Sequence, residues 1–175
     1  MRTLIAQRLS LLLVLGLAAL TSCSRQEPLL TEPPPVVPGE VVMNEVYSRG
    51  VAGNLDWVEI YNPSSLPINI GGYKIYDAGG QTGVKEKKAI PAGTIVPARG
   101  FYVVVTDSNT SATVLDGFGL SSAGEQVWLE NASGTLIDTI TFLAMETTQT
   151  YGRYPDGEAT WGILSAITRG ASNRQ

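Results

Sequence analysis

From about residue 40 to residue 173 the chain consists of short β-branched and aromatic runs, each followed by residues that favour turns. Such runs are typical of strands on a half-buried, pleated sheet, and glycine, proline, asparagine and aspartate punctuate them. No stretch in this region shows helical periodicity over eleven or more residues. The pattern predicts an all-β sandwich or barrel, and roughly 130 residues suffice for one two-layer core. The predicted strands are 41–47, 56–61, 68–76, 101–106, 126–130 and 136–142.

The alternation within these runs predicts which faces are buried. In the run 56–61, Val58 and Ile60 share one face, whereas Glu59 lies on the other. We therefore expect Glu59 to point outward, because successive side chains of a strand alternate between its two faces. The run 101–106 is apolar on both faces, which predicts a central strand.

Residues 1–22 are predicted to be a lipoprotein signal peptide. Two arginines precede an apolar run at 9–20, which at about twelve residues is shorter than the roughly twenty that cross a bilayer and fits a secretory signal. The sequence LTSC at 20–23 resembles the bacterial lipobox, which implies cleavage before Cys23 and acylation of its thiol and new amino group. Cys23 is the only cysteine, so no internal disulfide can form. The alternative is an incidental thiol beside an ordinary signal peptide.

Residues 23–39 combine the predicted lipidated Cys23 with a proline-rich linker. Five of the ten prolines lie here, and such a segment favours an extended spacer of ~3.1 Å per residue. The interpretation is an exported protein that is lipid-anchored in the bacterial cell envelope through its acylated cysteine. Ser24, rather than an aspartate, follows Cys23, which indicates the outer membrane if the organism has one.

The composition argues against several classes of function. The chain has no histidine, which removes the commonest general base and zinc ligand, and the acylated cysteine would be no nucleophile. No glycine-rich phosphate loop lies between a strand and a helix. The formal net charge is −4, and it becomes more negative without the signal peptide, because all sixteen acidic residues follow residue 22. We therefore expect no nucleic-acid partner and no cofactor.

Carboxylates remain the available chemical groups. Asp56 and Glu59, together with Glu45 and Asp77, could meet and coordinate Ca²⁺, or a pair of them could act on a glycosidic bond. The favoured interpretation is simpler, with Asp56 closing a turn and Glu59 pointing outward. We therefore predict no catalytic residues and no metal site, and we expect that the protein is not an enzyme.

Aromatic side chains next to these carboxylates suggest a contact surface. Aromatic rings serve protein and carbohydrate interfaces well, although in a sandwich they equally form the core. Trp128 and Trp161 could extend such a patch. The candidate binding surface consists of Asp56, Trp57, Glu59 and Tyr61.

The segment 152–157, with the sequence GRYPDG, contains a Pro-Asp-Gly turn. Arg153 and Asp156 could belong to a functional site. The favoured interpretation is that Arg153 pairs with a nearby acid.

Eight short motifs lie along the chain at 44–46, 56–62, 72–77, 90–95, 100–104, 118–121, 124–129 and 152–157. Their order and spacing resemble the lamin tail domain, the immunoglobulin-like module of nuclear lamins that also occurs in bacterial surface proteins. The long coiled coil of lamins is absent, and TRGASN at 168–173 stands where bacterial versions often have a Thr-Pro-Gly stretch. The resemblance implies an immunoglobulin-like β-sandwich over residues 40–173, without established catalytic residues.

These observations lead to one functional prediction and two alternatives. The prediction is a lipid-anchored envelope protein that displays a non-catalytic binding or structural module, with an unknown protein or glycan partner. The first alternative is a Ca²⁺-dependent adhesion module, or a carbohydrate- or protein-binding module. The second is an accessory domain or a weak carboxylate-based hydrolase.

Overall fold

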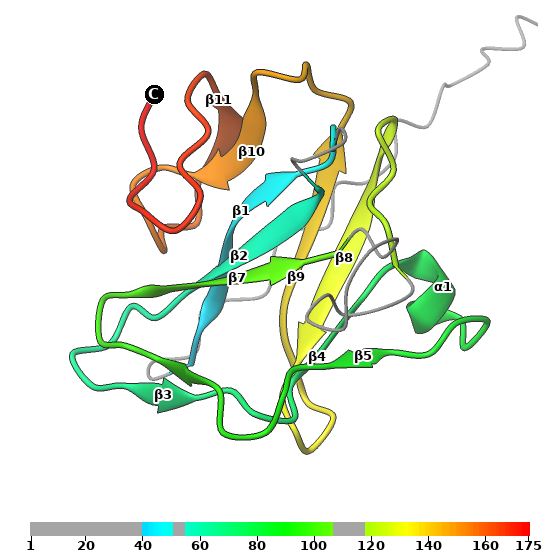
Figure 1. The fold of residues 1–175 in the computed structure, drawn as a ribbon, viewed down its shortest axis with the longest axis vertical. Coiled ribbons are helices and arrows are strands. Elements are labelled where there is room, and N and C mark those ends of the chain that lie inside the picture. Colours follow the sequence, from blue (N-terminus) through cyan, green and yellow to red (C-terminus); the bar gives the residue numbers. More distant parts are fainter. Residues whose placement is uncertain (1–39, 51–54, 107–117) are drawn as a thin grey trace, which may run out of the picture.

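The fold is given by a computed structural model that describes residues 40–50, 55–106 and 118–175 (Figure 1). The predicted signal peptide at 1–22 and the predicted linker at 23–39, with Cys23, lie outside the described residues. Within the described residues, β-strands form two main sheets with antiparallel pairing, and one four-residue helix is present. The predicted all-β class is confirmed.

The first sheet has five strands in the order β11-β10-β1-β2-β7. Its centre is β1, which pairs with β2 on one side and with β10 on the other. Strands close in sequence, β1 and β2, thus lie beside strands from the end of the chain. The bounds are β1 Val42–Tyr47, β2 Trp57–Tyr61, β7 Phe101–Val105, β10 Thr150–Arg153 and β11 Trp161–Leu164.

The second sheet has four strands in the order β5-β4-β8-β9, and a two-stranded ribbon of β3 and β6 lies apart from it. The short helix α1 (Ala78–Gln81) begins at Asp77, whose side chain accepts a hydrogen bond from the Gly80 amide. The bounds are β3 Ile68–Asn69, β4 Lys74–Tyr76, β5 Lys88–Ala89, β6 Ile95–Val96, β8 Gly124–Glu130 and β9 Leu136–Leu143.

The two sheets enclose one hydrophobic core. Val46, Val58 and Val104 lie on the inner face of the first sheet, in register with one another on β1, β2 and β7. Val127 and Leu129 of β8 belong to the same core cluster from the second sheet. Burial of these side chains stabilises the packed layers, at about 25 cal/mol per Å² of apolar surface removed from water. The alternation of apolar side chains that the sequence predicted for these strands is therefore present in the structure.

Two of the predicted strands differ in the structure. The run 68–76 divides into β3 and β4, because Gly72 adopts a positive φ of 82° that breaks the extended chain. The run 101–106 is not central, since β7 lies at the edge of the described first sheet. The apolar side chains on the outer face of β7 pack beside those of β2, and the ring centroids of Phe101 and Tyr61 lie 4.9 Å apart. The strands β10 and β11 were not predicted.

Candidate functional site

The four residues of the predicted binding surface are buried. Trp57 and Glu59 are 0% exposed, Asp56 is 6% exposed and Tyr61 is 9% exposed. The expectation that Glu59 points into solvent is wrong, although its alternation with Val58 and Ile60 holds. The residues that follow β11 lie over Glu45 and Glu59 on the outer face of the first sheet. This part of the outer face is therefore covered by the chain itself and is not exposed to solvent.

Glu45 of β1 and Glu59 of β2 lie opposite each other on this outer face. The Gly170 amide donates to Glu59 Oε2 at 2.6 Å, and the Thr168 hydroxyl donates to Glu45 Oε2 at 2.9 Å. From β10, the Thr150 hydroxyl donates to Glu45 Oε1 at 2.6 Å. The two carboxylates thus hold the C-terminal segment 165–175 against the sheet.

Asparagine side chains complete this arrangement. Asn44 Nδ2 donates to Glu59 Oε1 at 3.2 Å and to Asp156 Oδ1 at 3.0 Å. Asn173 Nδ2 donates to the carbonyl oxygens of Asn44 at 3.1 Å and Arg153 at 2.7 Å. We call this set the C-terminal network, and its members are Asn44, Glu45, Glu59, Thr150, Asp156, Thr168, Gly170 and Asn173.

Gly152 leaves the space that the network needs. An added Cβ would lie 2.6 Å from Leu164 Cδ1 and 2.8 Å from Asn173 Nδ2. Both distances are shorter than a Cβ tolerates, so a larger residue would force the side chains of Leu164 and Asn173 to move. The glycine of the 152–157 motif is therefore needed for close packing.

Burial alters the acid–base behaviour of both glutamates. Loss of hydration raises the pKa of Glu59 to about 7, and the hydrogen bonds from Gly170 and Asn44 offset part of that rise. The pKa of Glu45 is also raised by burial. The neighbouring Asp156 raises both values further, because like charges disfavour ionisation.

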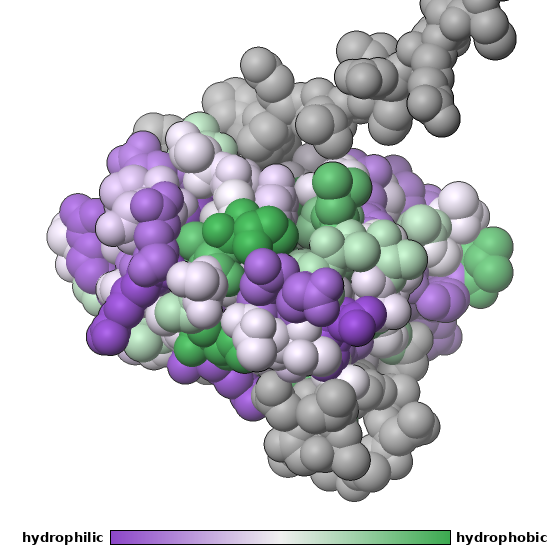
Figure 2. Space-filling view, turned by 90° about the horizontal axis from the view of Figure 1, so that it is seen from above, coloured by the Kyte–Doolittle hydropathy of each residue, from purple (hydrophilic) through white to green (hydrophobic). Residues whose placement is uncertain are grey.

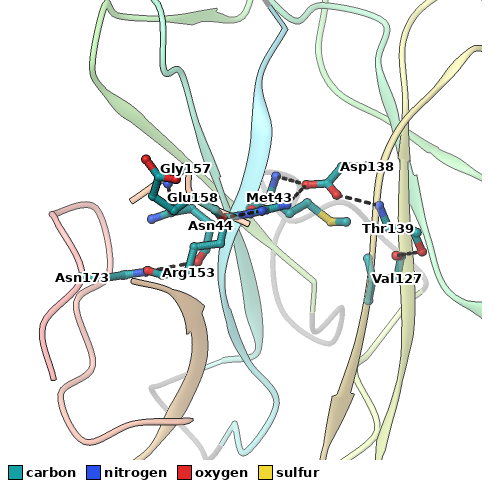
Figure 3. A network of polar contacts seen from close by, with 9 residues as sticks. All are labelled: Met43, Asn44, Val127, Asp138, Thr139, Arg153, Gly157, Glu158 and Asn173. Carbon is teal, nitrogen blue, oxygen red and sulfur yellow. Dashed lines mark hydrogen bonds and ion pairs between the residues drawn. The ribbon is translucent and has the colours of Figure 1, made fainter. Parts of the chain in front are cut away.

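A buried ion pair joins the two sheets next to the C-terminal network (Figure 3). Arg153 Nη2 of β10 lies 2.9 Å from Asp138 Oδ2 of β9, and both side chains are at most 2% exposed. Arg153 Nε also donates to the carbonyl of Met43 at 2.7 Å, and the Met43 amide donates to Asp138 Oδ2 at 2.9 Å. Arg153 pairs with an acid, as predicted, but that acid belongs to the opposite sheet.

Asp56 lies at a different place, at the end of the sandwich where β1 ends and β2 begins. Its carboxylate accepts hydrogen bonds from the amides of Gly50 at 2.6 Å and Leu120 at 3.2 Å, so it joins two loops, as a turn-closing acid should. A cavity of about 340 Å³ opens beside it. We call it the mouth cavity, and its described lining is Ser48, Arg49, Gly50, Asp56, Leu120, Ser122 and Thr147.

Of the four carboxylates that the sequence suggested for Ca²⁺, only Glu45 and Glu59 lie opposite each other. Asp77 caps α1 and pairs with Lys85 at 2.6 Å, whereas Glu45 and Glu59 bind the C-terminal segment. Across the described ranges, no three histidine, cysteine, aspartate or glutamate side chains are grouped so that they could hold a metal ion. The calcium hypothesis therefore gains no support from this arrangement.

The predicted aromatic patch is divided between separate places. Trp128 lies partly exposed in β8 of the second sheet, where its ring stacks on Tyr76 with centroids 5.9 Å apart. Trp161 stacks on Tyr151 at the opposite sheet, and Trp57 stacks on Tyr47 in the interior. These rings do not form one continuous contact surface.

Sequence reasoning missed five members of the C-terminal network: Asn44, Thr150, Thr168, Gly170 and Asn173. Their signal was weak, because single polar residues in strands and loops usually face water. The segment 168–173 was noted only for its difference from a Thr-Pro-Gly stretch. Its amides and hydroxyls satisfy the two buried carboxylates, but only the structure shows that the segment lies opposite them.

The part of the chain that the structure describes contains no helix long and apolar enough to cross a membrane. A search of curated proteins found no match. The model of one protein family, the Lamin Tail Domain, matches residues 34–144. This family is an immunoglobulin-like, non-catalytic module, which agrees with the antiparallel sandwich described above. Since the match covers more than half of its residues, the chain belongs to the lamin tail domain family.

Proposed function

We propose that this protein is an exported bacterial lipoprotein, anchored in the cell envelope through acylated Cys23, which displays its lamin tail domain as a non-catalytic binding or structural module. The observation that carries the proposal is the order of three features along one chain. A lipobox-like sequence ends at Cys23, a proline-rich segment follows to residue 39, and the family match begins at residue 34. This order is typical of an anchor, a spacer and a displayed domain.

The arrangement of the polar groups supports the non-catalytic part of the proposal. Glu45 and Glu59 lie opposite each other on the first sheet, but hydrogen bonds from neighbouring strands and from the C-terminal segment engage all four of their oxygens. The donors are Asn44, Thr150, Thr168 and Gly170. A carboxylate pair that hydrolyses a glycosidic bond must instead face a substrate and water. The pair is thus better suited to holding the fold together than to catalysis.

Intact-mass measurement tests the anchoring. The protein is purified from bacterial membranes beside a Cys23→Ala control that is expressed in the same strain. We expect the mass of residues 23–175 plus acyl groups, and loss of the acyl mass from the control. An unacylated mature chain that is free in the medium would refute the anchor and leave a secreted domain of the same family.

A further inference from the structure

The mouth cavity has a polar lining, which the packing of the two sheets does not require. Its volume of about 340 Å³ falls at the lower end of the range for ligand sites, roughly 300–1,000 Å³. The loops around it come from three places in the sequence and include Arg49, Ser122 and Thr147. Most of its lining residues are polar, so the cavity suits a small hydrophilic molecule.

Two buried hydroxyl groups close to this cavity lack partners. Ser48, which lines the cavity, is 2% exposed, and Thr106 is 0% exposed. Among the described residues, Ser48 Oγ and Thr106 Oγ1 are two of only four buried polar side-chain atoms with no hydrogen bond. An unsatisfied buried hydroxyl costs about 1–3 kcal/mol, and such a group calls for a bound molecule or water.

The position of these hydroxyls follows from the strand register. Val46 of β1 and Val104 of β7 point into the core, and Ser48 and Thr106 each lie two residues further along. The Thr106 amide donates to the carbonyl of Asp56 at 2.9 Å, which places Thr106 next to a cavity residue. The inner face of the first sheet therefore changes from apolar to polar where the cavity opens.

Arg49 adds a positive charge to this polar end. Its guanidinium forms no ion pair or hydrogen bond with any other residue of the described ranges. Its backbone is held, because the Tyr47 hydroxyl lies 3.0 Å from the Arg49 carbonyl and 3.1 Å from the Thr147 carbonyl. A guanidinium without a partner is suited to binding a carboxylate through two parallel hydrogen bonds.

Asp56 restricts which anion the cavity accepts. Its carboxylate lies in the same wall and repels a compact anion that fills the cavity. A ligand that carries its carboxylate at one end and hydroxyl groups at the other avoids this repulsion, because the hydroxyls then face Asp56 and the serine and threonine side chains. Acidic sugars have this distribution of groups.

We propose that the mouth cavity binds a carboxylate-bearing sugar, with Arg49 holding the carboxylate and the Ser122 and Thr147 hydroxyls facing the sugar ring. The site is independent of the anchoring proposed above. It is also compatible with it, because β1 begins at Val42, near residue 40 where the linker joins, and reaches the cavity only at its other end. In Figure 2, the face of the molecule that is seen from above carries hydrophobic patches that lie between hydrophilic ones.

The test is an NMR and calorimetric titration of the full chain with methyl glucuronide and methyl galacturonide. Methyl glucoside, which lacks the carboxylate, and acetate, which lacks the ring, serve as comparison probes. We expect at least one uronide to shift the amide signals around Gly50, Leu120 and Ser122, and the glucoside and acetate to bind at least tenfold more weakly. Absence of binding by both uronides would overturn the proposal.

Two further outcomes would also overturn it. Equal affinity for acetate would make the cavity a site for simple anions, and equal affinity for the glucoside would leave Arg49 without a role. Arg49→Gln should weaken uronide binding at least tenfold, whereas Arg174→Gln, an exposed arginine near the C-terminus, should not change it. Ser122→Ala, at an exposed position, should weaken binding severalfold, and unchanged thermal unfolding of each variant verifies the fold.

Discussion

The C-terminal network and the mouth cavity are two polar regions of the same sheet with opposite hydrogen-bonding states. In the network, the carboxylates of Glu45 and Glu59 receive donors from the C-terminal segment and neighbouring strands. At the cavity, the hydroxyls of Ser48 and Thr106 receive none from the described residues. All four of these residues are at most 2% exposed, so burial alone does not separate a structural role from a binding role.

The difference lies in whether the fold supplies the partners. A buried polar group that the fold satisfies stabilises the native state, whereas an unsatisfied one costs free energy until a ligand or water arrives. We therefore interpret the C-terminal network as a set of contacts that stabilises the domain, and the mouth cavity as its proposed ligand-binding site. Substitutions that remove polar groups should affect the two regions differently.

The largest expected effect comes from the ion pair beside the network. Asp138→Ala leaves Arg153 buried without a counter-charge and removes the acceptor of the Met43 amide. We expect a loss of about 3–5 kcal/mol in the free energy of unfolding, because the arginine cannot regain its hydration. Urea denaturation measures it, with Glu86→Ala at an exposed position as the control. A loss below about 1 kcal/mol would show that water reaches the pair, given the usual cost of an exposed pair.

A matched pair of threonines compares the two regions directly. Thr150 and Thr106 are both 0% exposed, but only the Thr150 hydroxyl donates to a carboxylate, at 2.6 Å. Thr150→Val should therefore lower the free energy of unfolding by about 1–3 kcal/mol, whereas Thr106→Val should leave it unchanged or raise it. Thermal and urea unfolding of both variants provide the measurement. Equal destabilisation would contradict the contrast between network and cavity.

The pH dependence of stability tests the network through Glu59. Its folded pKa of about 7 lies above the unfolded value, so its contribution to stability is fully present below the unfolded pKa and is lost as the pH rises through about 7. The free energy of unfolding should fall with pH in this window, by at most about 1.4 kcal/mol per pH unit for this group. Urea titrations at several pH values from 5 to 8 measure the slope.

Glu59→Gln should reduce this slope, because the amide does not titrate. Glu158→Gln, at an exposed position, serves as the control and should keep the wild-type slope. A slope that is the same in all three proteins would assign the titration to another group, of which Glu45 is the nearest.

The smallest expected effect belongs to an exposed ion pair outside both regions. Lys85 Nζ lies 2.6 Å from Asp77 Oδ2, but the lysine side chain is 49% exposed. Lys85→Ala should cost below about 1 kcal/mol, since water and salt screen such a pair. The same urea assay at low and high salt measures it. A larger loss would mean that α1 depends on this contact more than its burial suggests.

Much of the sandwich could be predicted from local patterns. The runs at 41–47, 56–61 and 136–142 become β1, β2 and β9, because alternation and β-propensity act on neighbouring residues. The short strands β10 and β11 escaped prediction. They are four residues each, and β10 is a strand because it pairs with β1, more than a hundred residues earlier in the chain.

The candidate site was predicted less well than the fold. Alternation placed Glu59 correctly on the face opposite Val58, but it could not show that this face is covered. The covering segment follows β11, and its contacts with Glu59 and Glu45 span more than a hundred residues of sequence. The function of an outward-facing acid is therefore not readable from its own strand.

The sequence by itself determined the β-class of this domain, its core-facing residues and its similarity to the lamin tail domain, because periodicity and turn chemistry are local. It also carries the lipobox-like motif on which the anchoring proposal depends. Only the tertiary structure decided that Glu45 and Glu59 are interior and that Arg153 pairs with Asp138 across the sheets. It also decided that the hydroxyls of Ser48 and Thr106 have no hydrogen bond within the described residues. Hydrogen bonds and burial depend on which distant segments meet, and that is settled when the sheets pack and the C-terminal segment folds over them.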